Sequence, residues 1–280
     1  MTTGVTEEIL RGERFAFGRN WSRFLSVLTE TRIRDAELSL RTMLEVDDLR
    51  GKSFLDVGSG SGLFSLAARR LGATVSSFDY DPQSVMCTRE LRRRYFPDDA
   101  HWHVEEGSVL NADYMVAKGQ FDVVYSWGVL HHTGNMWRAL ENVSLSVSRG
   151  GQLFIAIYND QGTLSTWWRR VKKGYCSGIP GKALVCAVLI PFLVVGGAGR
   201  DLLKGRNPLA RYVRPTTRGM SAFYDWFDWL GGLPFEVATP EMILRFYRQR
   251  GFTLRNLISV GGKSGNNEYV FTKETGATAT

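Results

Sequence analysis

The sequence predicts an α/β fold in which short buried strands alternate with amphipathic helices. The first strand, 53–57, runs straight into three closely spaced glycines, and apolar residues then recur at helical spacing over 63–71. Further apolar runs at 74–78, 121–126 and 152–157 are separated by stretches of helical pattern. Such alternation is typical of a mostly parallel sheet with helices on both faces.

The turn after the first strand has the pattern Asp-x-Gly-x-Gly-x-Gly, from Asp56 to Gly62. Glycines let a ligand approach the backbone closely, and a strand that leads into a helix directs N–H groups and the positive helix end at one point. The dinucleotide fingerprint is excluded, because its third glycine would fall on Leu63 or Ser65. The phosphate loop is excluded as well, because its first glycine would fall on Val46. The turn therefore predicts a site for a polar or anionic group of another cofactor.

The composition is that of an ordinary globular chain, with 44% hydrophobic and 22% charged residues. A net charge of +7 favours an anionic substrate, a membrane surface or nucleic acid without choosing among them. The three cysteines form no C-x-x-C pair, which indicates thiols of a reducing compartment. Because the first residues include glutamates and no apolar segment, we expect a cytoplasmic protein without a secretory signal.

The organisation of the chain follows from where the strand–helix alternation begins and stops. We expect a helical cap or lid at 1–50, a cofactor-binding core at 51–158, an insert at 159–238, the last helix and terminal hairpin of the core at 239–274, and a tail at 275–280. One apolar helix face in the cap consists of Ile33, Ala36, Leu40, Met43 and Leu44. An aromatic stretch at 15–25 either packs in the core or closes over the cofactor, with Asn20 and Trp21 facing the site.

The second strand ends in Asp79-Tyr80-Asp81, and Pro82 then opens a helix. Asp79 lies about 20 residues past the glycine turn, where a carboxylate can accept both hydroxyls of a ribose. This position predicts an adenosine ligand but not its type. The alternative is that Asp79 only caps the helix, for which Asp81 is better placed.

Two pairs of histidines invite a functional interpretation. His101 and His103 alternate along the third strand, but no third ligand lies nearby in the sequence, so we expect no metal site. His131 and His132 follow the fourth strand. Ligands of open α/β sheets bind beyond the carboxyl ends of the strands, so this loop should line the pocket, with Tyr158 at the same edge.

The glycine turn and the string Phe-Asp-Val-Val-x-Ser-x-Gly-Val-Leu-His-His at 121–132 resemble the class I S-adenosylmethionine (SAM) methyltransferases, and the string resembles their ubiquinone- and menaquinone-biosynthesis type. The resemblance covers 51–158 and 240–272. It implies a Rossmann-like seven-stranded sheet of order 3-2-1-4-5-7-6 whose last strand is antiparallel, with SAM at the first turn. The cofactor contacts that we expect from it are Asp56, Gly58, Ser59, Gly60, Gly62, Asp79, Tyr80, Ser108, Val109 and Trp127.

The reaction implied by the resemblance is transfer of methyl from a sulfonium to an O, N or C acceptor. An O–H or N–H acceptor must lose its proton, and a histidine with its ordinary near-neutral pKa can take it. We predict His132 as the base, His131 as the alternative, and Tyr158 as the group that orients the acceptor. Either imidazole could instead only hydrogen-bond the following helix. The expected acceptor contacts are Asn20, Trp21, Asn159 and Trp226.

The insert contains an uncharged run, 183–199, bounded by Lys182 and Arg200. It is short for a membrane span and contains a proline, so it spans a membrane, lies on a membrane or greasy substrate, or is an ordinary buried helix. Basic residues that follow it would suit anionic headgroups or a phosphate. The aromatic stretch 219–236 either packs the insert onto the core or forms walls of the acceptor pocket.

These observations favour a SAM-dependent methyltransferase that acts on a small acceptor of lipophilic or anionic character, with peripheral membrane contact through 183–199. One alternative is an RNA or protein methyltransferase, although no nucleic-acid module is recognisable and we therefore do not favour nucleic acid. Another is an inactive SAM-binding scaffold, against which the intact acid and glycines argue. The sequence does not predict the oligomeric state.

Overall fold

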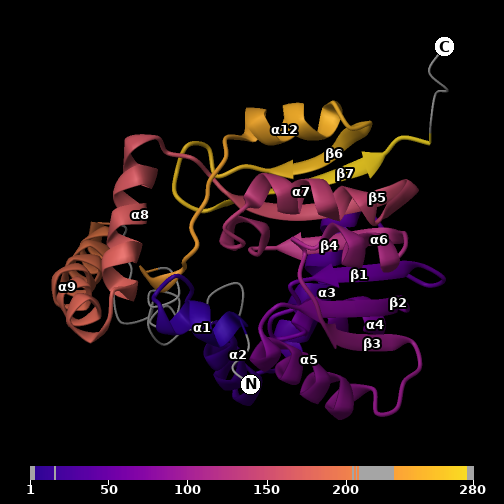
Figure 1. Cartoon of the computed structure of the whole chain (residues 1–280), viewed down its shortest axis with the longest axis horizontal. Coiled ribbons are helices and arrows are strands. Elements are labelled where there is room, and N and C mark those ends of the chain that lie inside the picture. Colours follow the sequence, from indigo (N-terminus) through magenta and orange to yellow (C-terminus); the bar gives the residue numbers. More distant parts are fainter. Residues whose placement is uncertain (1–3, 16, 204, 206, 208–229, 276–280) are drawn as a thin grey trace. The chain divides into compact units, whose positions relative to one another are not determined.

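The computed structural model describes residues 4–15, 17–203, 205, 207 and 230–275 of the chain (Figure 1). These residues form two compact units. The larger unit combines 17–161 with 236–280, and the smaller combines 1–16 with 162–235. The segment boundaries expected at 158/159 and 238/239 stay predictions. The boundaries between the two units, at 161/162 and 235/236, lie within a few residues of them.

The larger unit is built on a seven-stranded sheet of order β3-β2-β1-β4-β5-β7-β6, which confirms the predicted order. The strands are β1 (Ser53–Val57), β2 (Thr74–Asp79), β3 (Trp102–Glu106), β4 (Phe121–Trp127), β5 (Val147–Tyr158), β6 (Phe252–Ile258) and β7 (Asn266–Lys273). The first five pair in parallel, and β7 runs antiparallel to both β5 and β6. The ends of β1, β2 and β4 therefore meet at one edge, where a ligand of this kind of sheet binds.

Helices cover both faces of this sheet (Figure 1). They are α2 (Phe17–Ser26), α3 (Glu30–Leu44), α4 (Leu63–Arg70), α5 (Pro82–Tyr95), α6 (Ala112–Ala117), α7 (Met136–Leu145) and α12 (Pro240–Arg248), with a short 3-10 turn η1 (Leu130–His132). Asp81, the predicted cap of α5, accepts from the backbone N–H of Gln83. Thr239-Pro240-Glu241 has the cap, proline and acid that predict a helix start, and Thr239 accepts from the N–H of Met242, so both start signals are confirmed. The predicted apolar face of α3 is buried in full.

One helix end differs from its prediction. The helical spacing of Trp137, Leu140, Val143 and Val147 predicts a helix that ends at the glycines 150–151. Instead α7 ends at Leu145, and Val147 begins β5. Val147 pairs with Phe121 in the parallel ladder, and the register shifts just beyond it. A Cβ on Gly151 would lie 3.0 Å from the carbonyl oxygens of Phe121 and Asp122, so this glycine serves a close approach of two strands.

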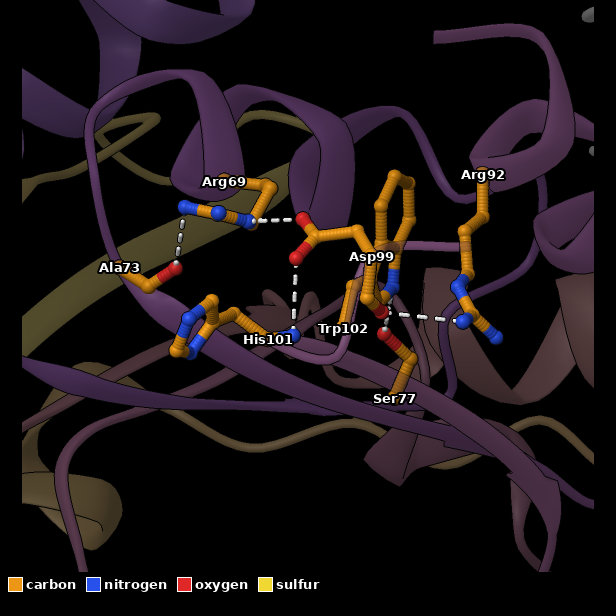
Figure 2. A network of polar contacts seen from close by, with 7 residues as sticks. All are labelled: Arg69, Ala73, Ser77, Arg92, Asp99, His101 and Trp102. Atoms are coloured by element: carbon orange, nitrogen blue, oxygen red, sulfur yellow. Dashed lines mark hydrogen bonds and ion pairs between the residues drawn. The ribbon is translucent and has the colours of Figure 1, made fainter. Parts of the chain in front are cut away.

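An ion pair between Arg69 and Asp99 ties α4 to the segment that leads into β3 (Figure 2). Asp99 also accepts from the backbone N–H of His101 at 2.8 Å, and its carbonyl accepts from Arg92 at 2.9 Å. Arg69 in turn lies 5.1 Å from the ring centroid of Phe96. The hydrogen bond from Arg69 holds the pKa of the Asp99 carboxyl below its ordinary value.

We expect Asp99→Asn to lower the free energy of unfolding by about 1–2 kcal/mol at pH 7. Because the folded-state pKa is lowered, the ionised carboxylate contributes stability above the unfolded pKa of about 4, and this contribution is lost as the pH falls through the folded pKa. Urea unfolding at pH 7 and pH 3 measures both effects. Asp98→Asn is the matched control, because Asp98 is exposed and has a left-handed backbone that asparagine tolerates. An equal loss in both variants would contradict the assignment.

The smaller unit contains α1 (Gly4–Leu10), α8 (Thr163–Cys176) and α9 (Ile179–Leu203). Within it, the Cys176 thiol donates to the Gly231 carbonyl at 3.2 Å, and the rings of Phe15 and Tyr175 lie 6.3 Å apart. By length and composition α9 is apolar enough to cross a membrane, and only 6% of its most apolar window is buried. Within the described part of the chain, the interpretation of 183–199 as an ordinary buried helix is therefore wrong.

Candidate cofactor and acceptor site

The glycine turn joins β1 to α4 in a conformation that side chains rarely adopt. Gly58 and Gly60 have φ angles of 78° and 56°. A Cβ on Gly58 would collide with the side chain of Val129, and a Cβ on Gly60 would lie 3.1 Å from the indole of Trp21. The two glycines are thus required both by backbone conformation and by close neighbours on other elements.

The backbone N–H groups of this turn are largely satisfied within the protein. Gly58 and Ser59 both donate to the carbonyl of Phe78, at 2.9 and 3.0 Å, and Gly62 donates to that of Ser59. Gly60 donates to Asp79 Oδ2 at 2.9 Å. We expected these N–H groups to point at the ligand, and for these four residues that expectation is wrong. The turn offers a ligand close backbone approach, while hydrogen bonding rests on neighbouring side chains.

Asp79 stands at the end of β2 beside the turn. Besides the Gly60 N–H, it accepts from the Asp81 N–H through Oδ1 at 2.9 Å. Asp81, and not Asp79, caps α5, so the interpretation of Asp79 as only a helix cap is wrong, and its contact with a ribose stays a prediction. A carboxylate has about four lone-pair sites and accepts hydroxyl donors as well as backbone N–H groups. Asp79 therefore fits the role of holding a ribose next to the turn.

Asp56 is buried at the end of a hydrogen-bonded chain that joins four elements, β3, β2, α4 and β1. Trp102 Nε1 donates to Ser77 Oγ at 3.0 Å, Ser77 and Ser65 hydroxyls lie 2.7 Å apart, and Ser65 donates to Asp56 Oδ2 (Figure 2 shows the Trp102–Ser77 end). Burial raises the pKa of Asp56 to about 7, the Ser65 hydrogen bond opposes the rise, and the charge of Asp79 adds to it. This side chain ties β1 to α4 and β2, and its direct contact with a cofactor stays a prediction.

We expect the free energy of unfolding of Asp56→Asn, relative to that of the wild type, to increase by about 2–3 kcal/mol as the pH rises from 5 to 8. The folded-state pKa of Asp56 lies above its unfolded value, so ionisation at higher pH destabilises the folded wild type, and the amide has no such penalty. Urea unfolding of both proteins at the two pH values measures the difference. A difference that is the same at pH 5 and pH 8 would show that Asp56 does not titrate in this range.

The residues expected around the remainder of the cofactor lie at the adjoining strand ends. Val109 is buried after β3, and the Ser108 hydroxyl accepts from the Leu110 N–H at 3.3 Å. Trp127 is half-buried at the end of β4. At the next residue, Gly128, no atom of the described residues beyond its own chain neighbours lies within 4 Å of the position of a Cβ, so space is open there. Tyr80 follows Asp79 and is exposed.

Trp21 places α2 against the glycine turn, through its contact with Gly60. Its ring lies 6.2 Å from that of Phe24 in an edge-to-face arrangement. The backbone N–H of Gly18 donates to Asp81 at 3.0 Å, which fixes the start of this helix to α5. Trp21 therefore covers the predicted cofactor turn. The side chain of Asn20 and the whole of Trp226 lie outside the described residues.

Three rings form a cluster beyond the ends of β4 and β5. The His131 and Tyr158 centroids lie 4.0 Å apart, those of His132 and Tyr158 5.3 Å, and those of the two histidines 4.4 Å. His131 is fully buried, its Nδ1 accepts from the Tyr158 N–H at 3.3 Å and its carbonyl accepts from the Glu236 N–H. His132 retains 8% exposure. The three predicted residues therefore lie together, and their roles in proton removal and acceptor orientation stay predictions.

Both polar atoms of the Asn159 side chain form hydrogen bonds within the protein. Its Nδ2 donates to the Lys263 carbonyl at 3.1 Å, and its Oδ1 accepts from Asn267 at 3.0 Å. These bonds tie the end of β5 to the terminal hairpin, so contact of this amide with an acceptor stays a prediction.

Three residues of this region were not predicted from the sequence. Val129 packs on Gly58, and Thr88 Oγ1 lies 2.9 Å from the Ser59 hydroxyl beneath the turn. Glu236 bridges the histidine loop to α7, because its carboxylate accepts from the Met136 N–H at 2.9 Å. Each acts through a tertiary contact that no local pattern signals. Among the described residues no group of three or more His, Cys, Asp or Glu side chains could hold a metal ion.

Comparison with known proteins identifies the family of the chain and solved structures that share its fold. A family model described as a methyltransferase domain matches residues 28–185. The chain is 35% identical over 111 residues to a tRNA U34 carboxymethyltransferase of Ectopseudomonas mendocina (strain ymp), which is 39% of this chain and 33% of the relative. It is 33% identical over 121 residues to the same-named protein of Pseudomonas aeruginosa (strain LESB58), which is 42% of this chain and 36% of the relative. The chain thus spans about a third of the length of these curated relatives.

Two solved structures share the fold. An O-methyltransferase family protein from Burkholderia thailandensis has a TM-score of 0.55 at 16% identity, with 97% of this chain and 68% of that chain covered. Magnesium protoporphyrin IX methyltransferase from Synechocystis PCC 6803 with bound SAH also has a TM-score of 0.55, at 14% identity, with 96% of this chain and 100% of that chain covered.

Proposed function

The chain belongs to the methyltransferase domain family, and we propose on this basis that it transfers a methyl group from SAM to a small acceptor molecule. The observation that carries the proposal is the meeting of two parts at one sheet edge. The glycine turn with Asp79 lies at the ends of β1 and β2, and the cluster of His131, His132 and Tyr158 lies beyond the ends of β4 and β5.

The residues at the turn fit SAM by their chemistry. Asp79 accepts the ribose hydroxyls, Gly128 leaves open space at the end of β4, and Trp21 covers the turn. Ser108 and Val109 are the predicted contacts of the adenine. When bound, SAM supplies a methyl group on a positively charged sulfur. The remaining task of the protein is to orient the acceptor and exclude water.

His132 is the group that we assign to proton removal from an O–H or N–H acceptor. It lies at the edge of the ring cluster, and its backbone is held in η1, where its N–H donates to the Val129 carbonyl at 2.8 Å. His131 fixes Tyr158 through the bond from the Tyr158 N–H. The Tyr158 side chain then orients the acceptor.

An RNA acceptor is the second candidate, because the curated relatives named above are tRNA U34 carboxymethyltransferases. The matched stretch covers a minor part of those relatives, and their nucleic-acid substrate therefore transfers weakly to this chain. The net charge of +7 is compatible with RNA and with an anionic small molecule alike.

Labelling from methyl-labelled SAM tests the proposal and separates the candidates. The purified chain is incubated with labelled SAM and an extract of cells that lack its gene, and the products are divided into small-molecule and lipid, RNA, and protein fractions. We expect label in the first fraction. Label confined to RNA would establish the second candidate, and failure to bind SAM in calorimetry would remove the proposed function altogether.

A further inference from the structure

The helix α9 presents a continuous apolar stripe to solvent. Leu184, Val188, Phe192 and Val195 follow one another at helical spacing and are between 60% and 72% exposed. The opposite side, with Val185, Leu189 and Leu193 among others, is half-buried. No charged residue interrupts 183–199. Exposed apolar surface of this extent marks an interaction site.

Two ordinary explanations of such a helix do not apply. The core helix of a soluble protein is mostly buried, whereas only 6% of the most apolar window of α9 is buried. A signal sequence lies near the N-terminus, whereas α9 occupies Ile179–Leu203 between strands of the catalytic sheet. Since no described part of the chain buries this face, it is available to a partner that offers a large apolar surface.

The sheet topology excludes a single crossing of a bilayer by α9. The strand β5 precedes this helix and β7 follows it, yet the two strands pair from Gln152–Thr272 to Tyr158–Asn266. The chain between them must therefore cross a membrane an even number of times. A second crossing has no sequence available, because the longest uncharged runs after Arg200 and before β7, 229–235 and 256–262, are far shorter than the roughly 20 residues that a span needs. The uncharged part of α9 would also extend only about 26 Å, less than the roughly 30 Å of a hydrocarbon core.

The charges at the ends of the stripe complement an anionic surface. Exposed Lys182 and Arg200 bound the uncharged run, and α8 carries exposed Arg170 and Lys173. Trp167 on α8 is also exposed, and tryptophan is enriched at the level of lipid headgroups. Gly181 allows the start of α9 to approach α8, because a Cβ there would collide with the Gly174 carbonyl. A helical pair with an apolar stripe and basic flanks is typical of a protein that lies on a membrane.

We propose that α9 lies in the plane of one leaflet of a bilayer that carries anionic lipids, with the stripe of Leu184, Val188, Phe192 and Val195 among the acyl chains. The smaller unit thereby anchors the enzyme to a membrane surface without spanning it. This inference does not depend on methyl transfer, because it rests on α8, α9 and the sheet pairing alone.

Flotation of the full chain with unilamellar vesicles tests the proposal. We expect the chain to float with vesicles of phosphatidylcholine and phosphatidylglycerol, and less with phosphatidylcholine alone. Phe192→Glu should reduce the bound fraction about tenfold, because a carboxylate is costly among acyl chains. Leu38→Glu is the matched control, because Leu38 on α3 is 62% exposed and belongs to the other unit. The fraction of this variant that floats with the vesicles should equal that of the wild type. Far-ultraviolet circular dichroism and thermal unfolding verify that each variant is folded.

Three results would overturn the proposal. The first is equal flotation of the wild type and Phe192→Glu, or no flotation of either. The second is a stable dimer in light scattering that Phe192→Glu separates, since the stripe would then be covered by a second copy of the chain. The third is protection of Arg206 and Arg211 from trypsin added outside preformed vesicles, which would place the segment after α9 across the bilayer.

Discussion

Replacing Asp79 with alanine is expected to weaken SAM binding about a hundredfold. Two hydroxyl donors to a carboxylate contribute about 1.5 kcal/mol each, and a factor of a hundred corresponds to about 2.8 kcal/mol. Asp79 stands at the end of β2, where its carboxylate accepts from the backbone N–H groups of Gly60 and Asp81 and is held beside the glycine turn. Calorimetric titration of the purified variant with SAM measures the loss.

The control for this prediction is Asp81→Ala. Asp81 also accepts backbone N–H groups next to α5, from Gln83 and Gly18, and its removal costs a helix cap of about 1 kcal/mol. We expect its SAM affinity to stay within about threefold of the wild type. If both variants lost affinity to the same degree, the effect of Asp79 would reflect a disturbed start of α5 and not a contact with the ribose.

Replacing His132 with alanine is expected to lower turnover about a hundredfold or more and to leave SAM affinity unchanged, because a positioned general base typically contributes at least that factor. The measurement is single-turnover methyl transfer with the acceptor fraction found by labelling, next to calorimetry with SAM. His132 lies in the ring cluster, 5.3 Å from Tyr158 between centroids, and not at the glycine turn, so the two readouts should separate.

His103→Ala is the matched loss of an imidazole, since His103 lies exposed on β3 and outside the ring cluster. It should retain full turnover. His131→Ala should lose stability as well as turnover, because His131 is fully buried and accepts from the Tyr158 N–H. A His132 variant with unchanged turnover, or with turnover and SAM affinity reduced together, would remove it as the base.

Much of the fold follows from signals that act over a few residues. The strand order came with the resemblance carried by the glycine turn and by the string at 121–132, and it is confirmed. The caps at Asp81 and Thr239 were predicted because a capping side chain and its N–H partner are near neighbours in sequence. The end of α7 was mispredicted, since the pairing of Val147 with Phe121 overrides the helical pattern.

The candidate site likewise has features that short sequence runs predict and features that only long-range contacts determine. The sequence alone determined the methyltransferase-like turn, the acid at the end of β2 and the histidine loop, because each is a short run next to a strand end. Only the tertiary structure decided that the N–H groups of the turn are internally paired, that Asp56 is buried against Ser65, and that Asn159 ties down the terminal hairpin. It also decided that α9 exposes its apolar stripe while β5 and β7 stay paired on either side of it in sequence. These features depend on contacts between residues far apart in the chain, and hydrogen-bond satisfaction and burial are properties of those contacts and not of any local pattern.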